Sequence, residues 1–266
     1  MIRMKFSAQE NLVPGDGLRK KAQLLEEIGY DGIEIWGREE VGSNINQIKD
    51  ELSTTKIRVS TICGGHPGDL LSPDIKEREK ALEGVIKRLN WANDLGAVGV
   101  IMVPTFGSPK VPNLAPLFKS QVELEEKLLV EELKIIAKEA ENLDSVVLLE
   151  PLNRYETHFI KTLDHARKIL EEVASEKVKM MADFFHMSIE EASIKDSVLR
   201  NLDYIYHFHL ADSNRFAPGR GHTDFSVLKT IKERGYKYYL ALECSMGDNP
   251  GEELGFTLNY LKRFVD

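Results

Sequence analysis

The second half of the chain contains four short apolar runs that each carry a polar side chain at or near their end: SVVLLEPL (145–152), VKMMADF (178–184), YIYHFHLAD (204–212) and YYLALEC (238–244). Four similar runs precede them: MKFSA (4–8), GIEIW (32–36), IRVSTIC (57–63) and VGVIMVP (98–104). Runs of this length, rich in β-branched and apolar residues, are typical of buried strands. The sequence therefore predicts eight strands at regular intervals.

The segments between these runs carry helical periodicity. Apolar residues recur three or four positions apart over 18–28, 78–95, 122–140, 163–173 and 225–231. Eight strands alternating with helices over 266 residues match the size of an α/β fold of the (β/α)8 TIM barrel type. A doubly wound open sheet is the alternative, but neither a GxGxxG motif nor a P-loop occurs in the chain.

We expect residues 1–266 to form a single barrel domain. No linker rich in proline, glycine or serine divides the chain. The proline-containing segment SPKVPNLAPLFKS (108–120) is interpreted as a long loop between a strand and the next helix. Such loops lie on the catalytic face of a barrel, where a lid would sit.

Composition limits the classes of partner. Apolar residues make up 42% of the chain and charged residues 29%, which is typical of a globular protein with a large core. The formal net charge of −8 argues against a general nucleic-acid-binding surface. The longest uncharged run, 95–109, is too short to span a membrane, and the N-terminus lacks the apolar segment of a secretory signal. Two cysteines form no disulfide framework, so a cytoplasmic location is predicted.

Polar residues end four consecutive predicted strands. These residues are Glu150, Asp183, His209 and Glu243. A carboxylate in an apolar strand is costly to bury unless it is paired or binds a cation, and the carboxyl ends of barrel strands converge. Three carboxylates and one imidazole suit Mn2+ or Mg2+ and also accept Co2+ or Zn2+. His209 is preferred over His207 as the ligand because it lies nearer the end of its strand.

Four motifs carry a resemblance to a known family. EPLNRYETHF (150–159), DFFHMSIEE (183–191), HFHLADSNRFAPGRGHTDF (207–225) and ALEC (241–244) resemble the xylose-isomerase-like TIM barrel superfamily, and within it the D-tagatose 3-epimerase and D-psicose 3-epimerase group. The first half resembles it more loosely, through GIEIWG (32–37), VSTICGG (59–65) and LGAVGVIMVP (95–104).

The resemblance implies roles for seven residues. Glu150, Asp183, His209 and Glu243 would hold one divalent metal ion per chain, typically manganese, and Glu150 and Glu243 would also be the catalytic acid–base pair. Glu156, His186 and Arg215 match the family positions that contact the sugar. A small sugar is thus the expected substrate, and relatives are commonly homodimers or homotetramers.

Epimerisation is the favoured reaction. A base on each face of a planar enediolate is needed to invert a carbon next to a carbonyl, and Glu150 and Glu243 lie on different strands. A metal-dependent sugar 3-epimerase is therefore expected. Aldose–ketose or hydroxypyruvate-type isomerisation and inosose-type dehydration are the alternatives. An abasic-site endonuclease of the same superfamily is disfavoured, because the run ending MVPTFG has no histidine and GHTDF replaces the expected Asp-x-His.

The sequence leaves open the roles of several further residues. His66, in CGGHPGD, follows the third predicted strand and is a candidate for the mouth of the site. Trp36 ends the second strand as either a substrate wall or a core residue. Cys63 and Cys244 are interpreted as small buried residues, and His222 and Asp224 as supporting groups or helix caps.

Overall fold

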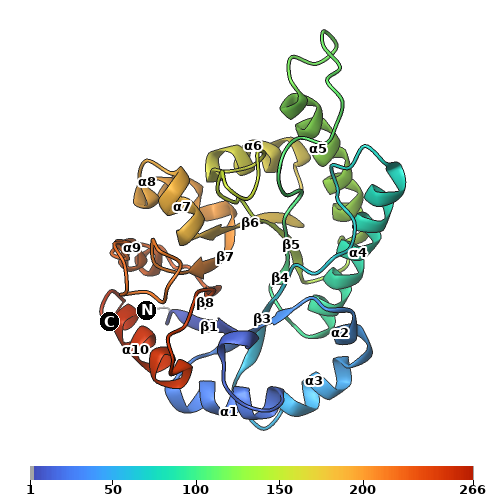
Figure 1. Cartoon of the computed structure of the whole chain (residues 1–266). Coiled ribbons are helices and arrows are strands. Elements are labelled where there is room, and N and C mark those ends of the chain that lie inside the picture. The colour runs from blue at the N-terminus through green and yellow to red at the C-terminus, as the bar shows by residue number, and fades with distance from the viewer. Residues whose placement is uncertain (1–2, 266) are drawn as a thin grey trace.

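The eight predicted strands form a closed parallel barrel in the computed structural model, which describes residues 3–265 (Figure 1). The strands are β1 (Lys5–Gln9), β2 (Gly32–Trp36), β3 (Arg58–Cys63), β4 (Gly99–Met102), β5 (Val146–Leu149), β6 (Val178–Asp183), β7 (Ile205–Leu210) and β8 (Tyr239–Leu242). They pair in chain order, and β8 pairs with β1 to close the barrel. The prediction of a (β/α)8 TIM barrel is confirmed.

Helices surround the barrel. They are α1 (Leu18–Ile28), α2 (Glu39–Ser43), α3 (Ile45–Leu52), α4 (Ile75–Asp94), α5 (Gln121–Glu139), α6 (Leu163–Val173), α7 (Phe184–Glu190), α8 (Ile194–Asn201), α9 (Val227–Glu233) and α10 (Pro250–Lys262), with short 3-10 turns at Glu10–Leu12 and Leu202–Tyr204. All five predicted helical segments are present. The short helices α7 and α8 follow β6 and lie beside each other in the ring (Figure 1).

The inside of the barrel has an apolar side and a polar side. A small apolar cluster comes from β3 to β6 and contains Cys63, Ile101, Val146, Leu148 and Met181. Along β4 and β5 these side chains alternate with residues of the larger core under the helices, so they point to the opposite face, toward the barrel axis. Buried polar residues come from β1, β2, β3 and β7: Ser7, Glu34, Ser60, His207 and His209.

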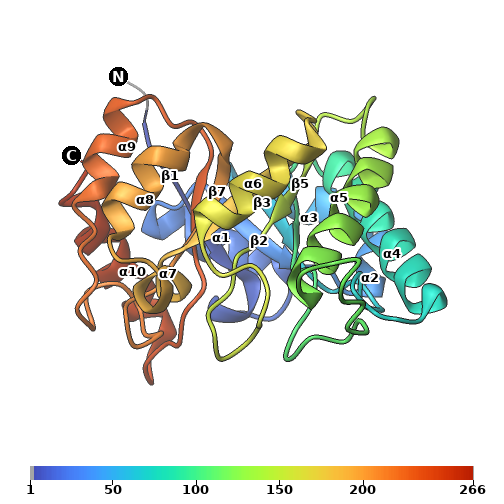
Figure 2. The ribbon, with the colours of Figure 1, turned by 90° about the horizontal axis from the view of Figure 1, so that it is seen from above.

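The loops that follow the strands gather at one end of the barrel, the lower end in Figure 2. The segment between β4 and α5 is a long loop there, as predicted for 108–120. Three apolar side chains in it are exposed: Phe106, Leu114 and Leu117. No helix of the described residues is long and apolar enough to cross a membrane.

Candidate active site

The four predicted ligands come together at the carboxyl ends of their strands. Glu150 directly follows β5, Asp183 ends β6, His209 lies near the end of β7, and Glu243 directly follows β8. One ligand atom from each lies within 4.8 Å of those of the other three. Asp183 also caps α7, because its Oδ1 accepts a hydrogen bond from the backbone N–H of Phe185 at 2.7 Å. The cap uses Oδ1, so Oδ2 can face the other three residues of the cluster and accept from Arg215.

The donor set fits a divalent cation. Nδ1 of His209 is buried and has no hydrogen-bond partner, an arrangement that is costly unless a ligand occupies it. It lies 3.2 Å from Glu243 Oε2 and 3.9 Å from both Glu150 Oε1 and Asp183 Oδ2. A lone pair that faces three carboxylate oxygens suits a cation of the manganese or magnesium type.

The pKa values of Glu150 and Glu243 reflect how close the charged groups of the cluster lie to one another. Burial raises the pKa of Glu150 well above its usual value, and the negative charges of Glu243 and Asp183 raise it further. Burial would also raise the pKa of Glu243, but the charges of His209 and Arg215 lower it to about 2. A cation between these oxygens would offset the repulsion that contributes to the raised pKa of Glu150.

A buried carboxylate of the second strand holds the histidine. Glu34 of β2 is fully buried, and its oxygens lie 3.0 Å from Nε2 of His209 and 2.9 Å from Nε2 of His207. The hydroxyl of Thr61 also donates to Glu34. If Nε2 of His209 carries the proton that Glu34 accepts, Nδ1 keeps its lone pair for a cation.

Sequence reasoning did not identify Glu34 as a functional residue. The signal was present in GIEIW, where a carboxylate lies between two apolar residues in a strand. The burial argument that identified the four ligands applies to this glutamate equally. Gln9, at the end of β1, was also missed, and its amide donates to Glu243 Oε1 at 2.8 Å.

The predicted substrate-contacting residues lie beside the cluster. His186, on α7, is buried, and its Nε2 lies 3.6 Å from Asp183 Oδ2 and 3.9 Å from Glu150 Oε1. Its Nδ1 lies 2.8 Å from the side-chain amide of Asn153, which donates to Glu156 Oε1 at 2.9 Å. Asn153 is a further residue that the sequence did not single out, and it links two of the predicted residues.

Arg215 spans the cluster from the loop after β7. Its Nη2 donates to Glu243 Oε2 at 2.6 Å, and its Nη1 lies 3.5 Å from Asp183 Oδ2. Its guanidinium lies over the ring of Phe185 at 4.6 Å. The backbone of Arg215 has a φ of 65°, in the left-handed region that most side chains avoid. The loop therefore aims this side chain at the site at a cost in local backbone energy.

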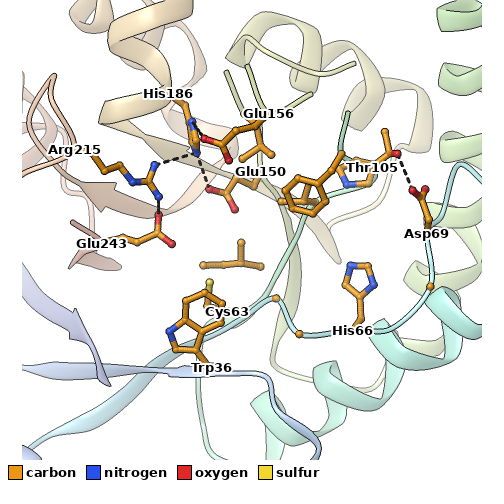
Figure 3. Close-up of a pocket in the computed structure, with 18 residues that line it drawn as sticks. Trp36, Cys63, His66, Asp69, Thr105, Glu150, Glu156, His186, Arg215 and Glu243 are labelled. Atoms are coloured by element: carbon orange, nitrogen blue, oxygen red, sulfur yellow. Dashed lines mark hydrogen bonds and ion pairs between the residues drawn. The ribbon is translucent and has the colours of Figure 1, made fainter. Parts of the chain in front are cut away.

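Five of the predicted site residues line one cavity of about 340 Å³ (Figure 3). Glu150, Glu156, His186, Arg215 and Glu243 lie along one side of it. Across the cavity lies His66, from the loop after β3, and between the two sides lie Trp36 and Cys63. Trp36 is thus a cavity wall, 37% exposed, and Cys63 is buried in agreement with its interpretation as a filler.

Three other residues considered in the sequence do not belong to the metal-ligand cluster. Asp224 accepts from the backbone N–H of Ser226 at the start of α9, so it serves the helix. His222 is exposed, and its backbone N–H donates to Ser213. Cys244 is half-buried.

A family model described as a xylose isomerase-like TIM barrel matches residues 22–264. The chain belongs to this family. A 3-dehydro-D-guloside 4-epimerase of Escherichia coli (strain K12) is 30% identical over 263 residues, which cover 97% of this chain and 99% of that protein. A D-psicose 3-epimerase of Enterocloster bolteae is 40% identical over 128 residues, 47% of this chain and 42% of that protein. These relatives are sugar epimerases, and they confirm the prediction of an enzyme of the isomerase class.

Two solved structures of sugar epimerases are also similar to this chain. An apo 3-keto-D-glucoside 4-epimerase from E. coli superposes with a TM-score of 0.88 at 28% identity, covering 98% of this chain and all of that one. A D-allulose 3-epimerase from Methylomonas sp. in complex with D-allulose gives a TM-score of 0.84 at 22% identity, covering 100% of this chain and 98% of that one. At that identity the second comparison shows the fold alone.

Proposed function

We propose that this protein is a metal-dependent sugar epimerase that inverts a carbon next to a carbonyl group. The observation that supports this most directly is the pair of glutamates, Glu150 and Glu243, brought from β5 and β8 to one cluster that borders a cavity of about 340 Å³. A single base would serve an isomerase. Two bases approaching from different strands suit removal of a proton on one face and its return on the other.

Each residue of the site has a separate role in the proposed reaction. One glutamate accepts the proton from the carbon next to the carbonyl, and the other supplies a proton to the opposite face of the planar intermediate. Arg215 and His186 bind the oxygens of the substrate at the same edge of the cluster, where both lie within 4 Å of Asp183. Glu156 contacts a hydroxyl group farther from the reacting carbon.

Glu150, Asp183, His209 and Glu243 would hold the cation, with manganese as the proposed metal. Bound there, a divalent cation supplies the Lewis acidity that makes a C–H bond next to a carbonyl acidic enough to ionise. Glu34 and Gln9 hold His209 and Glu243 in place beneath it. These two contacts keep the donor atoms directed at one point.

The relatives support a proposal for the position of the inverted carbon. The 4-epimerase of 3-dehydro-D-guloside matches almost the whole chain, whereas the D-psicose 3-epimerase matches less than half of it. We therefore favour inversion at C4 of a 3-keto sugar. The 3-epimerisation of a free ketose, predicted from the motifs, is the second candidate and is favoured by the higher local identity of 40%.

Incubation in D2O separates these reactions. The Mn2+-loaded enzyme is given 3-keto glycosides, free ketoses and inososes, and products are analysed for configuration and deuterium. An epimerase gives the inverted sugar with one deuterium at the inverted carbon. Loss of water from an inosose, or formation of an aldose from a ketose without inversion at C3 or C4, would contradict the proposal.

A further inference from the structure

The cavity extends well beyond the proposed metal site. Its volume of about 340 Å³ falls in the range, roughly 300–1,000 Å³, of pockets that enclose drug-sized molecules. A single sugar ring is smaller than such a molecule. A ring placed against Glu150 and Glu243 therefore leaves part of the cavity free, on the side away from Arg215 and His186.

That free side is lined by a distinct set of residues, which we call the outer subsite. It consists of His66 and Asp69 from the loop after β3 and Thr105 and Phe106 from the loop after β4, together with Trp36 at the end of β2, which lies between this side and the metal-ligand cluster. Figure 3 shows His66, Asp69 and Thr105 across the cavity from Glu150, Glu156 and Arg215. None of these five residues belongs to the metal-ligand cluster or to the predicted substrate-contacting trio.

Asp69 offers the outer subsite a fixed hydrogen-bond acceptor. Its Oδ2 accepts from the hydroxyl of Thr105 at 2.9 Å and pairs with Lys110, and its Oδ1 accepts from the backbone N–H of Leu71 at 2.8 Å. Donors from two loops therefore hold the carboxylate in one orientation. A carboxylate has room for further donors, and an acceptor that is already ordered loses little entropy on binding a hydroxyl group.

Two aromatic side chains, those of Phe106 and Trp36, also line the cavity. Phe106 is 56% exposed and Trp36 is 37% exposed, although both line the cavity. The indole of Trp36 is held by a hydrogen bond from its Nε1 to Asn11 Oδ1 at 3.2 Å. Flat apolar faces near a fixed polar group suit a ring that has C–H groups on its faces and hydroxyls at its edge.

Two glycines line the cavity between the metal-ligand cluster and the outer subsite. Gly64 and Gly65 line the cavity with positive φ values of 51° and 81°. A Cβ on Gly65 would lie 2.2 Å from the carbonyl oxygen of Gly37, so the loops after β2 and β3 touch through their backbones. The cavity therefore runs without a side-chain barrier at these positions from the cluster to the outer subsite.

We infer that the outer subsite binds a second, neutral sugar unit joined by a glycosidic bond to the keto sugar that reacts at Glu150 and Glu243. This inference rests on the proposed function and narrows its substrate class to disaccharide-like keto glycosides. The second unit packs on Phe106 and Trp36 and donates a hydroxyl group to Asp69. A phosphate in its place would face the Asp69 carboxylate, so the substrate is not phosphorylated on this unit.

The test compares two substrates that share the reacting ring. One is a 3-keto disaccharide, and the other is the methyl glycoside of the same 3-keto sugar. In Phe106→Ala, kcat/KM for the disaccharide should fall about tenfold through a higher KM, since an aromatic contact is lost, while the value for the methyl glycoside changes less than about twofold. Leu117→Ala is the matched control, because Leu117 lies in the same loop, is 82% exposed and does not line the cavity.

A second variant tests the polar contact. Asp69→Asn keeps the size of the side chain and should raise KM for the disaccharide while leaving KM for the methyl glycoside unchanged. A disaccharide phosphorylated on the second unit should bind more weakly than the neutral one. Equal losses for both substrates in Phe106→Ala and Asp69→Asn, or tighter binding of the phosphorylated sugar, would overturn the inference.

The outcomes separate this inference from the proposed function. If the wild-type enzyme epimerises both substrates with the same kcat/KM, the outer subsite is refuted and the epimerase stands. If neither substrate, nor any free ketose, reacts or exchanges deuterium with the Mn2+-loaded enzyme, the proposed function itself fails.

Discussion

Glu34 and His209 lie 3.0 Å apart between their Oε1 and Nε2 atoms, and both side chains are completely buried inside the barrel. The glutamate lies on β2 and the histidine on β7, and the two are 175 positions apart in the sequence. The contact fixes the imidazole ring so that Nδ1 points at the three carboxylates. A metal ligand held in this way needs no reorganisation when the cation arrives.

Replacing Glu34 by glutamine should therefore weaken metal binding. The amide keeps one acceptor oxygen but places N–H donors against His207, His209 or Thr61, so the histidine loses its fixed orientation. We expect the affinity for Mn2+, measured by isothermal titration calorimetry, to fall roughly 10- to 100-fold. Glu79→Gln, at an exposed position of α4, is the matched control. Unchanged affinity in a folded Glu34→Gln variant would contradict the positioning role.

Metal removal should lower thermal stability. A ligand that binds only the folded state stabilises it by about 2.7 kcal/mol at a free concentration of one hundred times Kd. After treatment with EDTA, addition of Mn2+ should raise Tm by several degrees, with one ion per chain by elemental analysis. Asp183→Asn keeps the cap on α7 but removes a ligand charge, so it should lose most of the shift. Three zinc ions per chain would contradict the predicted stoichiometry.

The two glutamates should fail in different ways when each becomes glutamine. Glu150→Gln and Glu243→Gln keep an oxygen near the cation but remove a base, so turnover should fall at least 10²–10⁴-fold. One variant should still exchange deuterium into one epimer, because the base on that face survives. The measurement is NMR of each epimer in D2O at saturating metal. Near-normal turnover in both variants would mean that the carboxylates act as ligands only.

Arg215 should be dispensable for folding and necessary for activity. Arg215→Gly removes both the guanidinium and the side chain that occupies a left-handed φ of 65°. We expect Tm to hold or rise, since glycine adopts this conformation without strain. The value of kcat/KM should fall roughly 10- to 100-fold, as expected for a lost charged hydrogen bond of about 1.5–3 kcal/mol. Arg220→Ala, in the same loop and paired with Glu253, should retain activity. Loss of metal content in Arg215→Gly would show a structural role instead.

Much of the site could be predicted because of how a parallel barrel is built. All strands run in one direction, so a polar residue at the carboxyl end of any strand must lie at the same end of the barrel. Four runs ending in Glu150, Asp183, His209 and Glu243 were therefore enough to predict a cluster. The positions of the strands and helices could be predicted because the spacing of apolar residues along the chain reflects local structure.

Contacts inside the barrel could not be predicted in this way. Glu34 and His209 lie on strands that are neither consecutive nor neighbours in the barrel, and their meeting depends on register, tilt and the bulge between β2 and β3. The direction of Arg215 depends on a backbone conformation that its own sequence does not favour. The outer subsite depends on two loops held together by Asp69, Thr105 and Lys110.

By itself, the sequence determined the barrel, the order of its elements and the four residues that converge at its carboxyl end, because each depends on local periodicity and on the common direction of the strands. Only the tertiary structure decided that Glu34 supports His209 and that one cavity joins the cluster to Asp69 and Phe106. Those relationships arise from side chains that meet across the barrel, where packing and loop geometry, rather than any pattern along the chain, set the distances.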